Sequence, residues 1–218
     1  MNAQAPIETF LARLAAAEPT PGGGAAAALG AAIAAALLQM YAGLSARSKR
    51  VAPDWQTEFH RVASEAEQWR TRVLHLMDVD AAAFDEVMRA LRLPRETPEE
   101  KAHRTRMLTH ALLRAAEIPL ETAEIAAKVM RACAHVLGHG IRSALSDLES
   151  AYQIARSAMA CALVNVAINL ENVQDTAVPE DLRRRYDAAC TALRQMPPYL
   201  WNPVWATSTG DIREEVKS

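Results

Sequence analysis

Residues 22–44 read GGGAAAALGAAIAAALLQMYAGL, and this stretch decides the fold class of the chain. Alanine and leucine are strong helix formers, and no proline or charged residue interrupts the run. The helix that it predicts has no polar face to turn toward water, so it needs neighbours on most sides. Its length would also suit a membrane span, but alanine gains little from transfer into lipid. We therefore expect a buried bundle helix and no membrane partner.

The composition of the whole chain favours helices as well. Aromatic residues make up 5% of the 218 residues, and β-branched residues are scattered, without alternating runs. Such a composition is typical of helical proteins. The 24 Lys and Arg nearly balance the 26 Asp and Glu, so no strong field predicts a nucleic-acid partner. A small molecule is the expected partner.

The cysteines and the N-terminus bear on the compartment. Cys133, Cys161 and Cys190 lie far apart and form no Cys-x-x-Cys pair, so they predict neither a zinc site nor a disulfide framework. The N-terminus lacks the basic and then apolar pattern of a signal peptide. Both observations favour a cytoplasmic protein.

Prolines and capping residues divide the chain into six or seven helices with short connections. Pro6 opens a short amphipathic helix, and Pro53 starts a long one that runs to about Leu91. A capping box at Thr97-Pro98-Glu99-Glu100 is expected to start a helix that runs to about Ala116, and Pro119 starts or kinks the next helix. A second capping box at Ser146-Asp147-Leu148-Glu149 is expected to start a helix that runs to about Leu170. The last helix is expected from Pro179 to Pro197.

These elements predict an all-α helical bundle without a sheet. We expect a single domain over residues 1–218, with its core at about 6–195 and a C-terminal tail at 196–218. A small monomer has difficulty covering the alanine-rich helix completely. A homodimer is therefore expected, with this helix near the subunit boundary.

Asp80 is the first candidate for chemistry, because it stands in an apolar helix seam. A carboxylate in such a seam is costly unless it is paired or hydrogen-bonded, and its pKa is usually shifted. It is either a structural aspartate satisfied by a partner or a general acid/base in a cleft. Asp78 and Asp85 fall off the seam and are expected to be solvated. The apolar members, at spacings of three and four, are Val73, Leu76, Phe84, Val87 and Leu91.

Two further segments offer polar groups. Asn165 and Asn169 share one face of an otherwise apolar helix, and their amides need partners. The hydrogen-bond partners of these amides could come from a heterocyclic ligand or from neighbouring backbone groups and water. The spacing alone favours the second, structural role. The turn Gly22-Gly23-Gly24 presents backbone N–H groups at a helix start, suited to an anion or to close packing. It has no Walker lysine and follows no strand, so nucleotide binding is not expected.

His135 and His139 have the four-residue spacing of a helical metal pair. Gly138 interrupts the helix between them, and no third ligand is evident nearby. We therefore predict no metal site.

The motifs occur in the order found in one family. The most specific are Pro19-Thr20-Pro21-Gly22-Gly23-Gly24 and Asn165-Val166-x-Ile168-Asn169-Leu170, with Asp78-x-Asp80-Ala81-x-Ala83-Phe84 between them. In these segments the chain resembles the formiminotetrahydrofolate cyclodeaminase and methenyltetrahydrofolate cyclohydrolase family, over roughly residues 6–195.

This resemblance implies a dimer-forming all-α fold, with Asp80 as the acidic catalytic residue. It also implies a folate site at the glycine-rich turn and the helices near it. The chain departs from the family pattern at Gly138-His139, where an imidazole replaces the usual amide. The substrate-binding candidates are thus Pro21, Gly22, Gly23, Gly24, His139, Asn165 and Asn169.

The expected activity is hydrolysis of 5,10-methenyltetrahydrofolate to 10-formyltetrahydrofolate, because no formiminotransferase domain precedes this segment. The alternative is a formiminotetrahydrofolate cyclodeaminase that releases ammonia. A second alternative, of another class, is a non-catalytic helical dimer that binds folate or a protein. Neither reaction calls for a cofactor beyond the tetrahydrofolate substrate.

Overall fold

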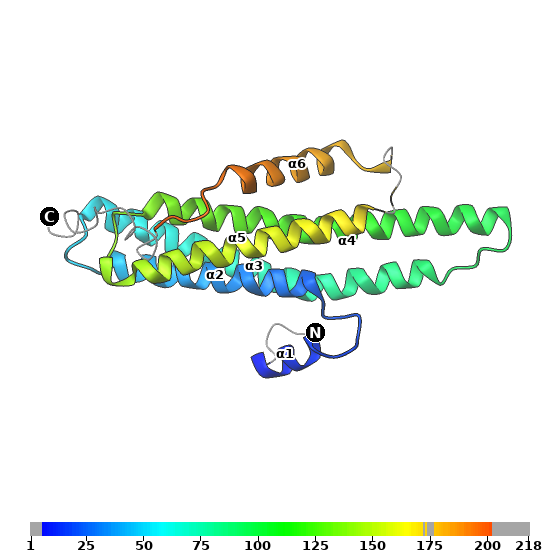
Figure 1. Cartoon of the computed structure of the whole chain (residues 1–218), viewed down its shortest axis with the longest axis horizontal. Coiled ribbons are helices and arrows are strands. Elements are labelled where there is room, and N and C mark those ends of the chain that lie inside the picture. The colour runs from blue at the N-terminus through cyan, green and yellow to red at the C-terminus, as the bar shows by residue number, and fades with distance from the viewer. Residues whose placement is uncertain (1–5, 172, 174–176, 202–218) are drawn as a thin grey trace, which may run out of the picture.

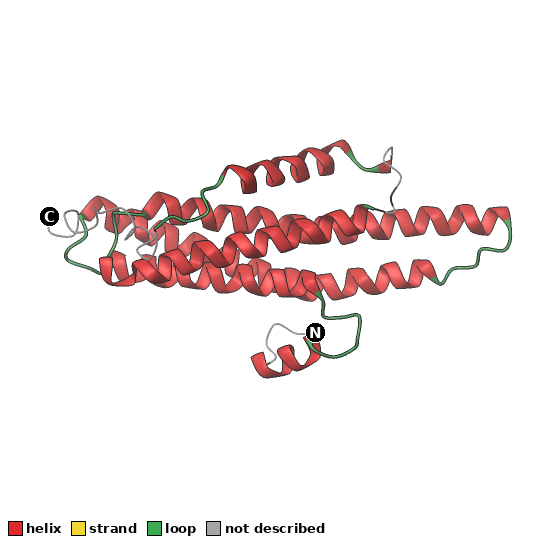
Figure 2. Ribbon diagram, viewed as in Figure 1, coloured by secondary structure: helices red, strands yellow, loops and turns green. Residues whose placement is uncertain are grey.

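The computed structural model describes residues 6–171, 173 and 177–201, and this part consists of helices and loops (Figure 2). The elements in order are α1 (Ile7–Leu14), α2 (Gly23–Ala46), α3 (Pro53–Leu91), α4 (Pro98–Val136), the 3-10 helix η1 (Arg142–Ala144), α5 (Leu145–Leu170) and α6 (Glu180–Gln195). The predicted all-α class is confirmed for the described residues. The single domain over residues 1–218 stays a prediction, since 202–218, with Trp205, lie outside that part.

Helices α2 to α5 form a four-helix bundle, with α2 packed between α3 and α5 and facing α4 across the core (Figure 1). Short loops join successive helices, so neighbours run antiparallel. Helix α6 lies along α4 and α5, where Arg185 Nε donates to Glu124 Oε1 at 2.8 Å. Helix α1 stands beside the bundle on its own loop.

Much of the alanine-rich helix α2 is buried by its neighbours, as predicted, while Ile33, Met40 and Leu44 on its outer face stay exposed. Its small side chains allow close approach, and a Cβ on Gly30 would stand 3.4 Å from Ala158 Cβ of α5. By length and composition alone, α2 and the η1–α5 segment could each cross a membrane, but 56% and 44% of their apolar windows are buried inside the chain. A bundle-core helix has the same composition. The residues of α2 without exposed surface include Ala31, Ala34, Ala35, Leu38, Tyr41 and Ala42.

Helix α4 corrects the predicted boundary at Ala116 and Pro119. The capping box at Thr97 is present as predicted, with Glu100 N donating to Thr97 Oγ1 at 3.2 Å. The helix then continues through Pro119 to Val136. Proline removes one backbone hydrogen bond of a helix, but here its ring is buried in the core, and packing keeps the helix continuous.

The capping box predicted at Ser146 is wrong. Helix α5 begins at Leu145, directly after η1, and no side chain caps its first turn. The Glu149 carboxylate, which would complete the box, instead accepts hydrogen bonds from the backbone N–H groups of Leu200 at 3.1 Å and Trp201 at 2.8 Å. A contact distant in sequence therefore takes the group that the local motif needs.

Helices α3 and α4 are longer than the other two bundle helices. Each has 39 residues, against 24 in α2 and 26 in α5. Their connected ends, which include residues 91–110, therefore project past the start of α2 and the end of α5 as a two-helix arm, seen as the green hairpin on the right of Figure 1. Seam residue Leu91 is 41% exposed on this arm, because only α4 accompanies α3 there.

Candidate active site

A pocket of about 240 Å³ opens where α2 begins, α5 ends and the arm leaves the bundle. Three helices supply its polar groups: the first turn of α2, the middle of α3 and the last turns of α5. The seam of α3 runs from buried Val73 and Leu76 into this pocket. The lining residues are Pro19, Thr20, Gly22, Gly23, Gly24, Asp80, Phe84, Val87, Ala115, Asn165, Ile168 and Asn169.

The Asp80 carboxylate lies directly against the backbone of Gly24. A Cβ on Gly24 would stand 2.7 and 2.8 Å from the two carboxylate oxygens, closer than real contacts allow. Burial raises the pKa of Asp80 above its usual range, since the charged form loses hydration. Among the residues that the structure describes, no hydrogen bond or ion pair satisfies this carboxylate. The arrangement favours the acid/base role over that of a structural aspartate.

Asn169 is fixed by a hydrogen bond that depends on Pro119. Because Pro119 has no N–H, the carbonyl of Ala115 one turn earlier lacks its helical donor. Asn169 Nδ2 donates to this carbonyl at 2.8 Å. The amide orientation is thereby set, and Asn169 Oδ1 remains as an acceptor at the pocket.

Asn165 lies one turn earlier on α5, and its amide bonds to its own helix. Its Nδ2 donates to Cys161 O of its own helix at 2.8 Å. A Cβ on Gly23 would stand 3.2 Å from the same nitrogen, so the glycine lets the amide lie close to α2. The two asparagines thus share the pocket wall, as their spacing predicts, with backbone partners that leave acceptor atoms for a ligand.

The first turn of α2 adds backbone donors. Gly22 is its N-cap, and no side chain accepts from the first N–H groups. An α-helix leaves these donors without intrahelical acceptors. Pro21 is buried just before them and shares with Asp80 a second, smaller hollow beneath α1. The predicted glycine-rich turn and the predicted acid are therefore brought together.

Asp78 and Asp85, the two aspartates on either side of Asp80, differ in their exposure to solvent. Asp85 is exposed, as expected. Asp78 is half-buried, and its Oδ1 is buried without a hydrogen-bond partner in the described part of the chain. The prediction that Asp78 is solvated is therefore wrong, because the seam pattern marks only the most buried face of a helix that also packs at its flanks.

His139 lies at the opposite end of the bundle. Its ring stacks on Trp55 at 3.5 Å, and Ile141 N, two residues further on, donates to Ser45 Oγ near the end of α2. Ser45 is about 30 Å along α2 from Gly24, at 1.5 Å per residue. The predicted substrate contact of His139 stays a prediction, and no contact of His139 among the described residues links it to the pocket.

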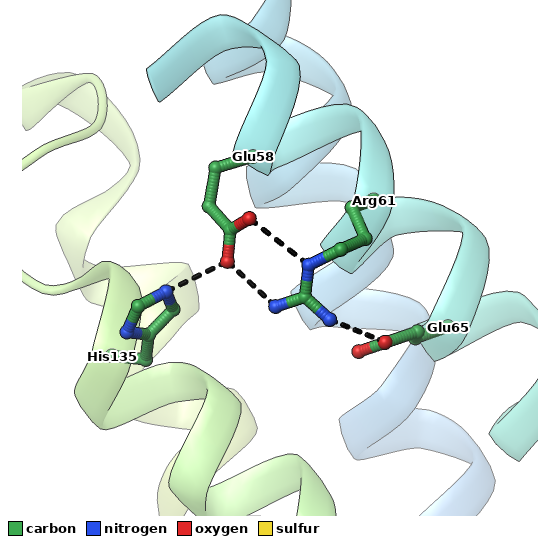
Figure 3. Close-up of polar contacts among 4 residues, drawn as sticks. All are labelled: Glu58, Arg61, Glu65 and His135. Carbon is green, nitrogen blue, oxygen red and sulfur yellow. Dashed lines mark hydrogen bonds and ion pairs between the residues drawn. The ribbon is translucent and has the colours of Figure 1, made fainter. Parts of the chain in front are cut away.

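His135 belongs to a charged cluster at that same end (Figure 3). Its Nε2 lies 2.7 Å from Glu58 Oε1, and Arg61 Nε donates to Glu58 Oε2 at 2.9 Å. Hydrogen bonds from Arg61, and then from His135, lower the pKa of Glu58 to about 2 despite its partial burial. Arg61 also pairs with Glu65. Within the described residues, no group of three or more His, Cys, Asp or Glu could hold a metal ion.

Sequence patterns missed two parts of the site formed by the pocket and the smaller hollow. The Ala115 carbonyl is one, although a proline inside a helix always implies an unpaired carbonyl four residues earlier. Arg13 of α1 is the other, and it lines the smaller hollow with Asp80. No local pattern places it there, since the position of α1 depends on a contact distant in sequence.

The geometry agrees with the comparisons to known proteins. The model of the formiminotransferase-cyclodeaminase family matches residues 6–188, a range that contains every group of the pocket. The chain belongs to this family. The family resemblance of the sequence motifs is therefore confirmed.

Two curated relatives show how this family member compares in length. Methenyltetrahydrofolate cyclohydrolase of Methylorubrum extorquens is 34% identical over 175 residues, which cover 80% of this chain and 84% of that protein. Formimidoyltransferase-cyclodeaminase of Sus scrofa is 32% identical over 180 residues, which cover 83% of this chain but 33% of the pig protein. The chain thus spans about a third of the pig relative.

A solved structure has the same fold as this family member. The formiminotetrahydrofolate cyclodeaminase of Thermotoga maritima superposes with a TM-score of 0.77, covering 88% of this chain and 91% of that one. At 24% sequence identity, the likeness bears on the helical architecture alone.

Proposed function

We propose that this chain is a folate one-carbon enzyme that hydrolyses 5,10-methenyltetrahydrofolate to 10-formyltetrahydrofolate. The observation that carries the proposal is the half-buried carboxylate of Asp80, which has no partner among the described residues and lies between the first turn of α2 and the two amides of α5. Membership of the formiminotransferase-cyclodeaminase family supports a folate substrate. Similarity over most of the length of a methenyltetrahydrofolate cyclohydrolase supports this reaction.

In the proposed reaction, Asp80 acts on a water molecule beside the cationic methenyl carbon. The carboxylate orients the water and accepts one of its protons as the oxygen bonds to that carbon. The C–N5 bond then breaks, N5 takes up a proton, and the formyl group stays on N10, so that one proton is released overall. The negative charge of the half-buried Asp80 also stabilises the cationic centre.

The asparagines and the α2 turn bind the substrate in this proposal. The oxygen atoms of Asn165 and Asn169 accept from the N–H groups of the pterin ring, and the first N–H groups of α2 donate to its oxygen. These steps need no metal, because the substrate already carries the positive charge that a Lewis acid would otherwise supply. We propose that no cofactor is required.

The alternative activity is cyclodeamination, supported by the family relatives that carry cyclodeaminase in their names. There N10 attacks a formimino carbon and ammonia leaves, with Asp80 moving the protons. The same pocket could serve either reaction.

One assay separates these activities. The purified protein is incubated with methenyltetrahydrofolate or with formiminotetrahydrofolate, with and without a chelator, while the methenyl absorbance and ammonia are followed. With methenyltetrahydrofolate, we expect the methenyl absorbance to fall faster with the protein than in buffer alone, at a rate that the chelator does not change. With formiminotetrahydrofolate, we expect no release of ammonia. Ammonia release with gain of that absorbance would assign the cyclodeaminase activity instead. If the methenyl absorbance does not change and no ammonia appears, the chain is a non-catalytic binding protein.

The two asparagines are expected to respond differently to replacement by alanine. Asn169→Ala leaves the Ala115 carbonyl without a donor, so the free energy of unfolding should fall by about 1–3 kcal/mol and folate binding should weaken. Asn165→Ala removes a bond within one helix turn, so only folate binding should weaken. Urea unfolding and folate titration of both variants test this. Equal stability losses in the two would contradict the Pro119 argument.

We also propose that the chain forms a homodimer through α2. Large apolar side chains remain exposed on its outer face, with Ile33 at 45%, Met40 at 42% and Leu44 at 46%. A second copy could cover this stripe and the adjoining apolar groove of about 550 Å³ between α2 and α5. Such exposed apolar patches are typical of interfaces.

Sedimentation at low micromolar concentration tests the dimer. The parent chain should sediment as a dimer, and Ile33→Asp should sediment as a monomer, because a carboxylate would be buried in the interface. Met107→Asp is the matched control, since Met107 is 45% exposed but lies on the arm, and it should remain dimeric. A monomeric parent, or equal effects of both substitutions, would argue against the α2 interface.

The compartment is proposed as well. The three cysteines are free, which agrees with a reducing environment, and we propose the cytoplasm.

A further inference from the structure

We infer that Arg13 of α1 binds the glutamate carboxylates of the folate substrate, an assignment that rests on the proposed function. Arg13 is exposed and lines the smaller hollow together with Thr20, Pro21 and Asp80. Among the residues that the structure describes, no carboxylate lies within ion-pair distance of its guanidinium. The cation beside the catalytic pocket is therefore available to an anionic group of a ligand.

Two apolar side chains of α1, Phe10 and the partly buried Leu14, set the position of Arg13. Phe10 is 4% exposed and is buried against Ala25 and Ala28 of α2 and Met77 of α3. Arg13 follows three residues later, so it lies on the same face of α1 as Phe10. Ile7, by contrast, is 71% exposed and contributes little to this contact. The Phe10 contact therefore brings the guanidinium to the mouth of the site.

The two hollows meet at Asp80 and Thr20, which line both of them. Asn165 and Asn169 lie in the larger hollow, and Arg13 lies in the smaller one, so Asp80 separates the amides from the cation. A folate has the same order of groups: a pterin ring with hydrogen-bonding edges, then the one-carbon centre at N5 and N10, then an aryl group and glutamate. With the reacting carbon at Asp80 and the pterin on the amides, the glutamate is directed toward Arg13.

Size and charge restrict what Arg13 can contact. The smaller hollow has a volume of only about 20 Å³, which does not admit an aryl ring. The aryl group must therefore leave along the surface beside α1, where the exposed guanidinium can meet the carboxylates that follow it. Arginine presents several N–H donors in a planar fork that matches a carboxylate. Recognition would thus depend on the glutamate and not on the reacting centre.

The test compares two substrates, 5,10-methenyltetrahydrofolate and 5,10-methenyltetrahydropteroate, which lacks the glutamate. For Arg13→Gln we expect KM for methenyltetrahydrofolate to rise about 10-fold with kcat nearly unchanged, and KM for methenyltetrahydropteroate to stay as in the parent.

Three further variants serve as controls. Arg13→Lys keeps the charge and should recover part of the loss. Phe10→Ala should reproduce the KM effect by releasing α1. Arg142→Gln, an exposed arginine at the opposite end of the bundle, should match the parent.

The outcomes distinguish this assignment from the proposed function. If Arg13→Gln changes KM for both substrates equally, or changes kcat alone, the glutamate contact is overturned. If the parent hydrolyses neither substrate, the proposed function fails. Binding of 5-formyltetrahydrofolate and 5-formyltetrahydropteroate by calorimetry then decides on Arg13. Weaker binding of only the glutamate-bearing ligand by Arg13→Gln supports the contact, and unchanged binding of both overturns it.

Discussion

Replacing Asp80 by asparagine is expected to lower turnover by about 10²–10⁴-fold, the usual contribution of general acid/base catalysis, while folding and folate binding persist. Asparagine has nearly the same shape, so it fits against Gly24 as the carboxylate does. It cannot accept a proton at neutral pH or offset a cationic carbon. Turnover and melting temperature measured on the same preparation check this. Asp85→Asn, an exposed position on the same helix, is the matched control.

Because the pKa of Asp80 is raised, both the turnover and the stability of the parent should depend on pH. Turnover of the parent should fall on acidification at a higher pH than for an ordinary aspartate, because the carboxylate is the active form. The protonated group is favoured in the folded state, so its stabilising contribution is present at low pH and is lost as the pH rises through the folded pKa. Asp80→Asn should therefore be at least as stable as the parent near neutral pH.

An Asp80→Asn variant with near-normal turnover would contradict the catalytic role. Lower stability with unchanged turnover per folded molecule would indicate a structural aspartate instead.

Gly24→Ala is the second substitution with a large expected effect on turnover. Its methyl group would stand 2.7 Å from the Asp80 carboxylate, and the short side chain can rotate away more easily than the helix can move. A displacement of about 1 Å at a reacting group can cost about 100-fold in rate, so we expect a loss of about 10- to 100-fold. The fold should persist, since alanine is a better helix former than glycine.

Steady-state kinetics and thermal melts of Gly24→Ala provide the measurement. Gly43→Ala is the control within the same helix, because its added Cβ meets no described atom within 4 Å beyond its own stretch of helix. Adding Gly24→Ala to Asp80→Asn should lower turnover little further, because both changes act through one carboxylate. Full additivity of the two losses would show that Gly24 acts independently of Asp80.

Local sequence patterns predicted the helices well, and long-range contacts account for the differences. Thr97 and Glu100 cap α4 as expected, because both partners lie within one turn. The box at Ser146 does not form, because Glu149 accepts from the backbone at Leu200 and Trp201, which only the folded chain brings near. Pro119 does not end α4, because the surrounding helices hold it in the core.

The candidate site could be predicted in part for the same reason. Asp80 was identifiable because a charge in an apolar seam is visible from spacing alone, and Asn165 and Asn169 because they share a helix face. Arg13 was not, because the Phe10 contact that positions α1 joins segments distant in sequence. The substrate contact of His139 stays a prediction that rests on the order of motifs along the chain, and order in sequence does not fix distance in a bundle with helices about 36 Å or more in length.

The projecting arm of α3 and α4 divides the chain into regions of unequal local stability. In the bundle each helix is covered by several others, whereas in the arm the two helices cover mainly each other, and no side chain from residue 91 to residue 110 is buried. Segments with few buried contacts open at a lower free energy than the global unfolding of a protein. The pocket lies on the border between the two regions, so a ligand that spans α2, α3 and α5 would couple the opening of the arm to its own release.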